Sequence, residues 1–250
     1  LQASYSLGIW QNASEGTVDS YLRDAAGNVI YNAGSAMANP LKFVRIDGRD
    51  YTVSSATPSR SRSEHWMHGL TVNAQFGGID WQAVASVYDQ KKDISRSATP
   101  VNGLDSSLGA VHPGGQITLA DGTGWQNLDL RGQLRLGQGA AHTLSFGAHH
   151  DRYRLASVTY GTAAAPIADW LSSTEGTLNT NSYGNTRTQA IYLQDEWVVA
   201  PGWTLLAGGR QERWLASGGS NYNAGNSAPN PKNLVYADRA YSHFSPKLHL

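Results

Sequence analysis

The sequence predicts an all-β protein: an antiparallel transmembrane β-barrel, present in part, with about eight strands of a larger barrel. Three observations lead to this fold class. Apolar and polar residues alternate along runs of about ten residues, the length of a membrane-spanning strand. Very short polar turns and long irregular connections follow one another in turn. Aromatic side chains flank the short turns, where the wall of a barrel meets the membrane surface.

Composition narrows the class of protein. The 250 residues have a formal net charge of zero, contain 27 glycines and lack cysteine. A neutral chain without a long basic run has no electrostatic basis for binding nucleic acid, so no such partner is expected. The lack of cysteine excludes disulfides, thiolate metal sites and cysteine nucleophiles. No apolar run reaches the length of a membrane helix, and no charged-then-apolar leader begins at Leu1.

The first three predicted strands are residues 3–10, 66–76 and 79–88. Tyr5, Leu7 and Ile9 recur at every second position of the first run, which places them on one face of a strand. The second and third runs alternate in the same way. Only Gly77 and Gly78 separate them, so these two runs predict a β-hairpin.

The fourth and fifth predicted strands, residues 127–136 and 143–151, have the clearest alternation. Leu130 and Leu134 occupy one face of the fourth strand, and Arg131 lies between them on the other. One face is therefore apolar and the other charged, as a wall between hydrocarbon and water requires.

The last three predicted strands are residues 190–199, 203–212 and 241–250. Ile191, Leu193 and Trp197 share the apolar face of the first of them, and Asp195 is an exception on that face. A turn at Pro201 leads into the next strand. The chain end cuts off the final run.

The connections alternate in length as the residues alternate in polarity. Short turns lie near residues 77, 138 and 201, and long connections span roughly 12–62, 95–124, 157–186 and 217–239. The short turns are expected to be periplasmic and the long loops extracellular. A soluble β-sandwich also alternates apolar and polar residues, but does not require this loop order. Four aromatics flank short turns on the apolar face, as a membrane girdle or as ordinary core residues: Phe76, Trp81, Trp197 and Trp203.

Several stretches of the chain carry a family pattern. They are residues 186–197 (TRTQAIYLQDEW), 203–205 (WTL), 208–212 (GGRQE) and 244–248 (FSPKL). These stretches resemble barrel hairpins of TonB-dependent outer-membrane receptors. Residues 20–28 and 121–125 resemble a loop hairpin and a strand start of the siderophore-receptor branch. The resemblance covers nearly the whole chain and implies a protein of the bacterial outer membrane.

The resemblance also implies a function and partners. Such receptors take up a ferric siderophore or a similar bulky nutrient, lie in outer-membrane lipid, and are energised by a TonB complex acting through a plug domain. The resemblance implies a receptor rather than an enzyme, and no cofactor.

The chain departs from the family pattern in size, since plugged transporters of this kind have ~22 strands. No plug domain or energy-coupling box precedes the first strand. Residues 1–250 are therefore expected to form part of the TonB-dependent receptor β-barrel domain, with the plug domain and the remaining strands absent. An open arc exposes two sheet edges, so the isolated polypeptide is expected to aggregate or to require detergent.

The parity of residues along the strands predicts a ligand-binding surface near the extracellular end of the inner wall. Six aromatic residues fall on the face opposite the lipid-facing residues of their own strands: Trp10, Tyr88, Trp125, Tyr153, Trp214 and Tyr241. Flat side chains with indole or phenol donors suit a bulky chelate. The alternative is that bulges shift some of them to the outer girdle. Further candidates in the loops are Tyr21, Tyr31, Tyr51, Tyr160, Trp170 and Tyr183.

Charged residues lower on the inner face have a structural interpretation, as contacts to water or to a plug: Asp129, Arg131, Arg135, Arg210 and Glu212. His149 and His150 are neighbours on a strand and therefore point to opposite faces, and His65 and His68 diverge in the same way. No metal site and no catalytic residues are expected, because no ligand set, nucleophile elbow or phosphate loop has the required spacing.

A second interpretation comes from another class of protein. A small closed outer-membrane barrel, acting as a porin or as a lipid or peptide hydrolase, is geometrically possible with eight strands. A hydrolase would need catalytic groups clustered at the rim, which the sequence does not offer. A plug-like domain upstream in the parent reading frame would favour the receptor, whereas a leader just before Leu1 and a stop after Leu250 would favour the small barrel.

Overall fold

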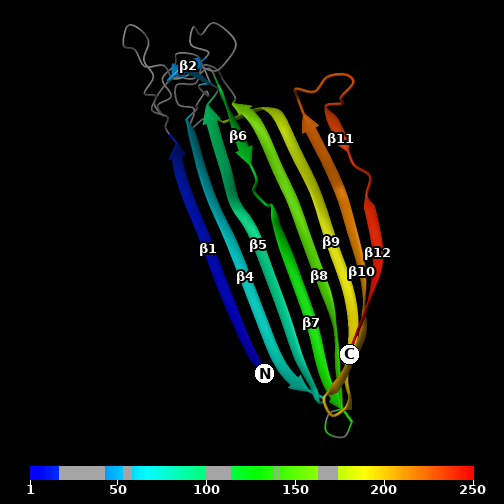
Figure 1. Ribbon diagram of the computed structural model, residues 1–250. Coiled ribbons are helices and arrows are strands. Elements are labelled where there is room, and N and C mark those ends of the chain that lie inside the picture. Colours follow the sequence, from blue (N-terminus) through cyan, green and yellow to red (C-terminus); the bar gives the residue numbers. More distant parts are fainter. Residues whose placement is uncertain (17–42, 53–57, 99–113, 138, 140, 163–173) are drawn as a thin grey trace, which may run out of the picture.

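The protein is an open antiparallel sheet. The computed structural model describes residues 1–16, 43–52, 58–98, 114–137, 139, 141–162 and 174–250. Within these ranges the chain forms one ten-stranded sheet and a separate two-stranded sheet. Figure 1 shows the long strands side by side, with both termini near the end where the short turns lie. No helix in the described ranges is long and apolar enough to cross a membrane. The predicted all-β fold class is confirmed.

All eight predicted strands are present. They are β1 (Gln2–Gly16), β4 (Ser59–Phe76), β5 (Ile79–Ala98), β7 (Gly124–Leu136), β8 (His142–Thr162), β9 (Glu175–Ala200), β10 (Trp203–Asn223) and β12 (Arg239–His249). Each pairs antiparallel with its neighbours in this order. Sequence neighbours are thus spatial neighbours, as in an up-and-down barrel wall.

Four short strands lie toward the other end of the sheet: β2 (Phe43–Ile46), β3 (Arg49–Thr52), β6 (Gly115–Leu119) and β11 (Asn233–Val235). β6 continues the position of β7 between β5 and β8 (Figure 1). The long connections were therefore predicted to be longer than they are, because the strands extend into both ends of the segments assigned to loops. Apolar alternation stops where a strand leaves hydrocarbon, but the backbone ladder continues with polar residues on both faces.

The short turns are the tight ends of hairpins. Gly77 and Gly78 have φ angles of 63° and 77°, and Gly202 has a φ of 79°. Gly77 and Gly78 both have the positive φ that the two central residues of a type I′ turn require, and this turn type matches the twist of the flanking strands. The hairpin predicted at Gly77 and Gly78 is confirmed, and so is the turn near 201. The strands on either side of the third short connection also pair, from Leu136 and His142 upward.

The strand register separates two faces. Ala83 lies opposite Leu130, Leu130 opposite Ala148, and Ala148 opposite Ile191. Directly opposed residues project from the same side of a sheet, so these residues form one apolar row across four strands. We call this side the outer face. The neighbouring row, which contains Asp129, lies on the inner face.

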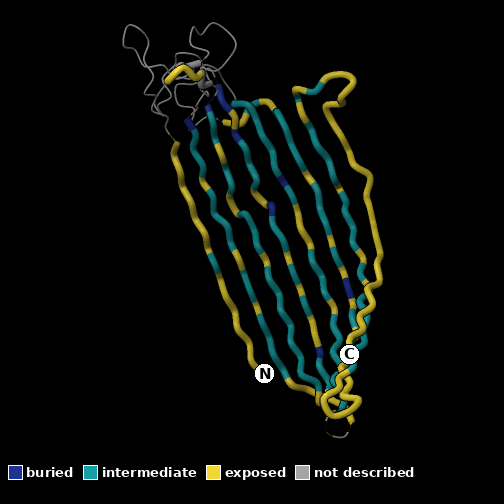
Figure 2. The backbone as a smooth tube through the Cα atoms, viewed as in Figure 1, coloured by how far each residue is buried: buried dark blue, intermediate teal, exposed yellow. Residues whose placement is uncertain are grey.

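The outer face has no packed partner. Leu130, Ile191 and Phe244 are 43%, 66% and 57% exposed, and the buried apolar side chains in the described ranges are few: Pro58, Ala98, Ile117, Ala156 and Ala190. Figure 2 shows intermediate and exposed residues along most of each strand. A soluble sandwich would bury these side chains between two sheets. An apolar face without a protein partner is instead that of a wall in contact with lipid.

The outer face carries aromatic residues near the short turns. Trp81 and Phe146 contact each other edge to face, with ring centroids 5.5 Å apart. Asp195, the exception to the alternation, accepts a hydrogen bond from His142 Nδ1 at 2.8 Å, and His142 stacks on Trp197 at 5.2 Å. The acidic residue on this face is thus paired within a polar and aromatic cluster close to the short turns.

Between β6 and β7 the Thr123 side chain supplies hydrogen bonds to β8 in place of a paired backbone. Its side chain is buried, and its hydroxyl donates to the Ala156 carbonyl oxygen at 2.8 Å. The same hydroxyl accepts from the Ala156 amide at 2.9 Å. A side chain thereby takes the place of a missing backbone partner, which keeps both polar groups of a buried residue paired.

Replacing Thr123 with valine should destabilise the folded barrel by about 1–3 kcal/mol, because valine keeps the shape but leaves the Ala156 amide and carbonyl unpaired. Urea unfolding of the protein in lipid measures this difference. Thr123→Ser keeps the hydroxyl and should retain most of the stability. Equal stabilities of the valine and serine variants would show that these hydrogen bonds contribute nothing.

Candidate functional site

The six predicted aromatic residues all project from the inner face. They lie on six of the eight long strands, with none on β4 or β9: Trp10 on β1, Tyr88 on β5, Trp125 on β7, Tyr153 on β8, Trp214 on β10 and Tyr241 on β12. Each directly opposes an inner-face residue of the adjacent strand. The bulges considered from the sequence do not move any of them to the outer face.

Three of these residues form a continuous row across the middle of the sheet. Tyr88 lies opposite Trp125, and Trp125 lies opposite Tyr153. The Tyr88 and Trp125 rings are stacked, with centroids 5.9 Å apart and planes 11° apart. Stacked rings present a flat, rigid surface with little side-chain entropy left to lose on binding.

His65 extends this row toward β1. Its ring lies 4.9 Å from that of Trp10 and 5.5 Å from that of Tyr88. Its Nδ1 shares a 2.6 Å hydrogen bond with the Tyr88 hydroxyl, and its Nε2 shares one of 3.0 Å with Asp93. The imidazole is held from both sides, so this part of the row is rigid.

A β-bulge brings Asp93 to this side of the wall. The pairing runs His65 with Gln90 and then Glu64 with Lys92, so β5 has one additional residue at Lys91. An extra residue reverses the parity of the strand beyond it. Asp93 therefore reaches His65 on the inner face, whereas alternation continued from the lower part of β5 would place it outside.

The remaining two aromatics form a second group. Trp214 lies opposite Tyr241, and their rings are stacked with centroids 5.8 Å apart. A concavity of about 440 Å³ joins this group to the first, because Tyr153 and Trp214 both line it, together with Tyr236 and Arg239. A single arginine within an aromatic hollow offers an anionic or carbonyl-bearing ligand a directed contact.

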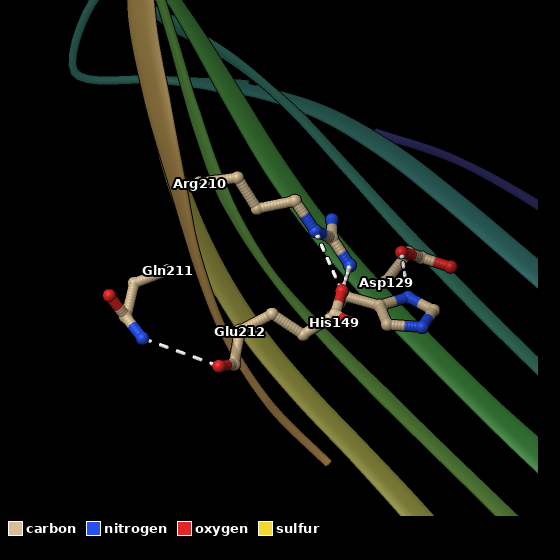
Figure 3. A network of polar contacts seen from close by, with 5 residues as sticks. All are labelled: Asp129, His149, Arg210, Gln211 and Glu212. Atoms are coloured by element: carbon tan, nitrogen blue, oxygen red, sulfur yellow. Dashed lines mark hydrogen bonds and ion pairs between the residues drawn. The ribbon is translucent and has the colours of Figure 1, made fainter. Parts of the chain in front are cut away.

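The lower inner wall is polar and largely paired within itself. His149 Nδ1 lies 2.7 Å from Asp129, and Arg210 lies 2.9 Å from Glu212. Figure 3 shows these four side chains on one side of the sheet, with Gln211 on the opposite side of β10. Arg135 lies 3.8 Å from Asp80. The inward placement predicted for these charged residues is confirmed.

A polar hollow of about 630 Å³ lies lower still on the inner wall. Its lining includes Asn73, Asp80, Gln82, Arg131, Gln133 and Ser145. Amide, hydroxyl and charged groups at this density are those of a surface that contacts water or a polar protein segment.

The histidines diverge as predicted. His65 faces the inner row, whereas His68 contacts Tyr5, with His68 Nδ1 2.7 Å from the Tyr5 hydroxyl. His149 faces Asp129, and His150 lines a groove on the outer face. In the described ranges no three histidine or acidic side chains come together as a metal site would require.

Of the aromatic residues predicted to be further ligand-binding candidates in the loops, some lie on strands and the others lie outside the described residues. Tyr160 and Tyr183 are on strands rather than in loops, where Tyr160 pairs with Leu178 and Tyr183 with Ala156. This placement corrects the sequence interpretation, which ended β8 too early. Tyr51 is on β3. Three further candidates lie outside the described residues: Tyr21, Tyr31 and Trp170.

Comparison with known protein families identifies the family of this chain. A family model described as TonB dependent receptor-like, beta-barrel matches residues 9–250. The chain belongs to the TonB-dependent receptor β-barrel family. No curated protein and no solved structure gives a significant match.

Membership of the TonB-dependent receptor family identifies the membrane in which the sheet lies and what each of its two faces contacts. The protein is located in the bacterial outer membrane, and the family consists of receptors and transporters rather than enzymes. The outer face of this TonB-dependent receptor barrel therefore contacts lipid, and the inner face lines the lumen. The family match favours a receptor over the porin or hydrolase considered from the sequence.

Proposed function

We propose that the full-length receptor takes up a ferric siderophore or a similar bulky nutrient, and that it binds this ligand on the aromatic inner wall. The proposal rests chiefly on the row that runs from Trp10 through His65 and Tyr88 to Trp125 and Tyr153. A chelate is large and flat-sided, and it carries carbonyl, hydroxyl or carboxylate groups. Stacking area next to a few fixed polar groups matches that chemistry.

The position of the row supports this role. It lies at the end of the membrane-spanning lengths of β5, β7 and β8, toward the long connections and away from the short turns. A ligand arriving from outside the cell reaches this level of the lumen before the charged lower wall. Binding here precedes any contact with the region that a plug would occupy.

We further propose that residues 1–250 are one segment of a larger barrel that encloses a plug domain. In the described ranges β1 pairs on one side only, with β4, and β12 pairs only with β10. Open edges on a membrane sheet require further strands to satisfy their backbone groups. The polar hollow around Arg131 and Gln133 offers the plug a hydrophilic surface. A TonB complex would act through that plug to release the ligand.

A binding screen on the full-length receptor in detergent tests the substrate class. Ferric catecholate, hydroxamate and carboxylate chelates are titrated separately while the intrinsic tryptophan fluorescence is recorded. One class should quench it saturably, because an iron chelate stacked near Trp125 accepts the excitation energy. The iron-free chelators are the matched controls. Saturable binding of a different bulky nutrient, with none by any ferric chelate, would disprove iron uptake.

A further inference from the structure

The outer face of β8, β9 and β10 carries a group of arginines that the uptake of a ligand does not explain. Arg152 and Arg154 are on β8, Arg187 is on β9 and Arg213 is on β10, and all four are exposed. The strand register places them on the outer face. Ala148 and Ile191 are paired on that face, and Arg152 and Arg187 are paired four residues farther along the same two strands, an even number that keeps the same side. We call these four residues the arginine patch.

The arginine patch lies at the extracellular boundary of the hydrocarbon layer. A tilted strand crosses that layer in about 9–11 residues. Counted from the short turns near 138 and 201, this length ends close to Arg152 on β8 and Arg213 on β10. Below the patch the outer face is apolar, with Leu130, Ala148 and Ile191. The guanidinium groups are therefore at the depth of the lipid headgroups.

The charges of the arginine patch are not compensated within the described chain. Arg152 directly opposes Arg187 across the β8–β9 ladder, a like-charge pair that disfavours the sheet unless an anion lies between the two side chains. None of the four forms an ion pair or a side-chain hydrogen bond with another described residue. The other residues opposite them are neutral: Gly124, Gln126, Asn185, Gln189, Leu215 and Ser242.

An apolar groove runs beneath the patch on the same face. Its volume is about 450 Å³, and it ends at His150, Gln189 and Arg213. The rest of the outer-face lining is mainly apolar, from Leu128, Leu130, Ala148 and Ile191, with Gln211 beside Ile191. A groove that is apolar at one end and cationic at the other fits a molecule with an acyl chain and an anionic head.

We propose that the arginine patch and this groove bind a phosphorylated lipid of the outer leaflet, the lipid anchor of lipopolysaccharide. Its phosphates lie between Arg152 and Arg187 and contact Arg213, and one acyl chain lies along the groove. Arginine suits this contact because the planar guanidinium group donates two parallel hydrogen bonds to a phosphate. The bound phosphate relieves the repulsion between Arg152 and Arg187. A protein partner could not reach these residues without displacing that lipid.

The test measures binding of bisphosphorylated lipid A to the full-length receptor in detergent, by native mass spectrometry over a lipid titration. Arg152→Gln/Arg187→Gln should weaken binding at least about tenfold, because each arginine near the headgroups attracts anionic lipid. The matched control, Arg131→Gln/Arg135→Gln, removes the same two charges from the inner face and should bind as the wild type does. Arg152→Lys/Arg187→Lys keeps the charge but loses the paired hydrogen bonds, and should bind with intermediate affinity.

Two further probes separate the lipid from simpler anions. Dephosphorylated lipid A should bind the wild type as weakly as bisphosphorylated lipid binds the glutamine variant, and inorganic phosphate should not compete at millimolar concentration. Equal binding by the glutamine variant and the control would overturn the proposal. Equal binding of the dephosphorylated lipid, or full competition by inorganic phosphate, would do the same. Heat-modifiable migration in detergent gels verifies that each variant is folded.

Discussion

Replacing Trp125 with alanine in the full-length receptor should weaken binding of its best ligand by about thirtyfold, the effect of losing one aromatic contact of about 2 kcal/mol. Trp125 is central in the inner row, because it stacks on Tyr88 at 5.9 Å and opposes Tyr153. Its removal takes away a stacking surface and leaves the Tyr88 ring without its neighbour. Isothermal titration with the ligand identified in the screen measures the change, and Tyr153→Ala should act in the same direction.

The matched control is Trp66→Ala, which deletes the same side chain from the outer face. Trp66 opposes Ile9 and donates to Glu64 at 2.7 Å, away from the lumen. This variant should bind ligand as the wild type does. If Trp125→Ala and Tyr153→Ala both fold and also bind normally, the ligand does not contact the inner row, although the family membership still holds.

Replacing Gly147 with valine should prevent most of the protein from folding. A Cβ atom at this position would overlap the Leu130 carbonyl oxygen and lie 2.8 Å from the Tyr192 ring and its hydroxyl. The carbonyl belongs to the paired strand and cannot move without breaking the ladder. Overpacking of this kind costs about 1–3 kcal/mol when neighbours can shift, and more when backbone is involved. The fraction of heat-modifiable, folded receptor in outer-membrane preparations measures the loss.

Ser145→Val is the control for Gly147→Val. Ser145 is two residues away on the same strand and the same face, and it already has a Cβ atom. Its valine variant adds a similar apolar volume without the overlap and should fold nearly as well as the wild type. Equal folding of the two valine variants would show that β7 and β8 have room at Gly147 and that the close approach is not required.

Alternation predicted the strands well because the membrane imposes it. Hydrocarbon contacts every second residue of a spanning strand, so the pattern in 127–136 or 190–199 is strong enough to identify each strand alone. Above the membrane both faces are polar, and the signal ends although the strand does not. For this reason β9 begins at Glu175 rather than near residue 190, and Tyr160 and Tyr183 were misplaced in loops.

The candidate site was predicted in part. Parity correctly assigned the six aromatics to the inner face, because no bulge interrupts the strands between their apolar runs and these residues. It missed His65 and Asp93 as members of the row. His65 could have been found by pairing the strands outward from the turn at Gly77 and Gly78, which sets it against Gln90 and close to Tyr88. Asp93 could not, since the bulge at Lys91 has no clear signal in the sequence.

By itself the sequence determined that this protein is a membrane wall with an apolar and a polar face. That information is local, because side chains two residues apart on a strand share a face whatever the partner strand is. Which residues meet was decided only by the tertiary structure. Strand register decides that Tyr88 stacks on Trp125 and that Arg152 opposes Arg187. The hydrogen bond between Asp93 and His65 depends on register and also on one bulge. These are set by pairing between segments distant in the chain, which no single strand encodes.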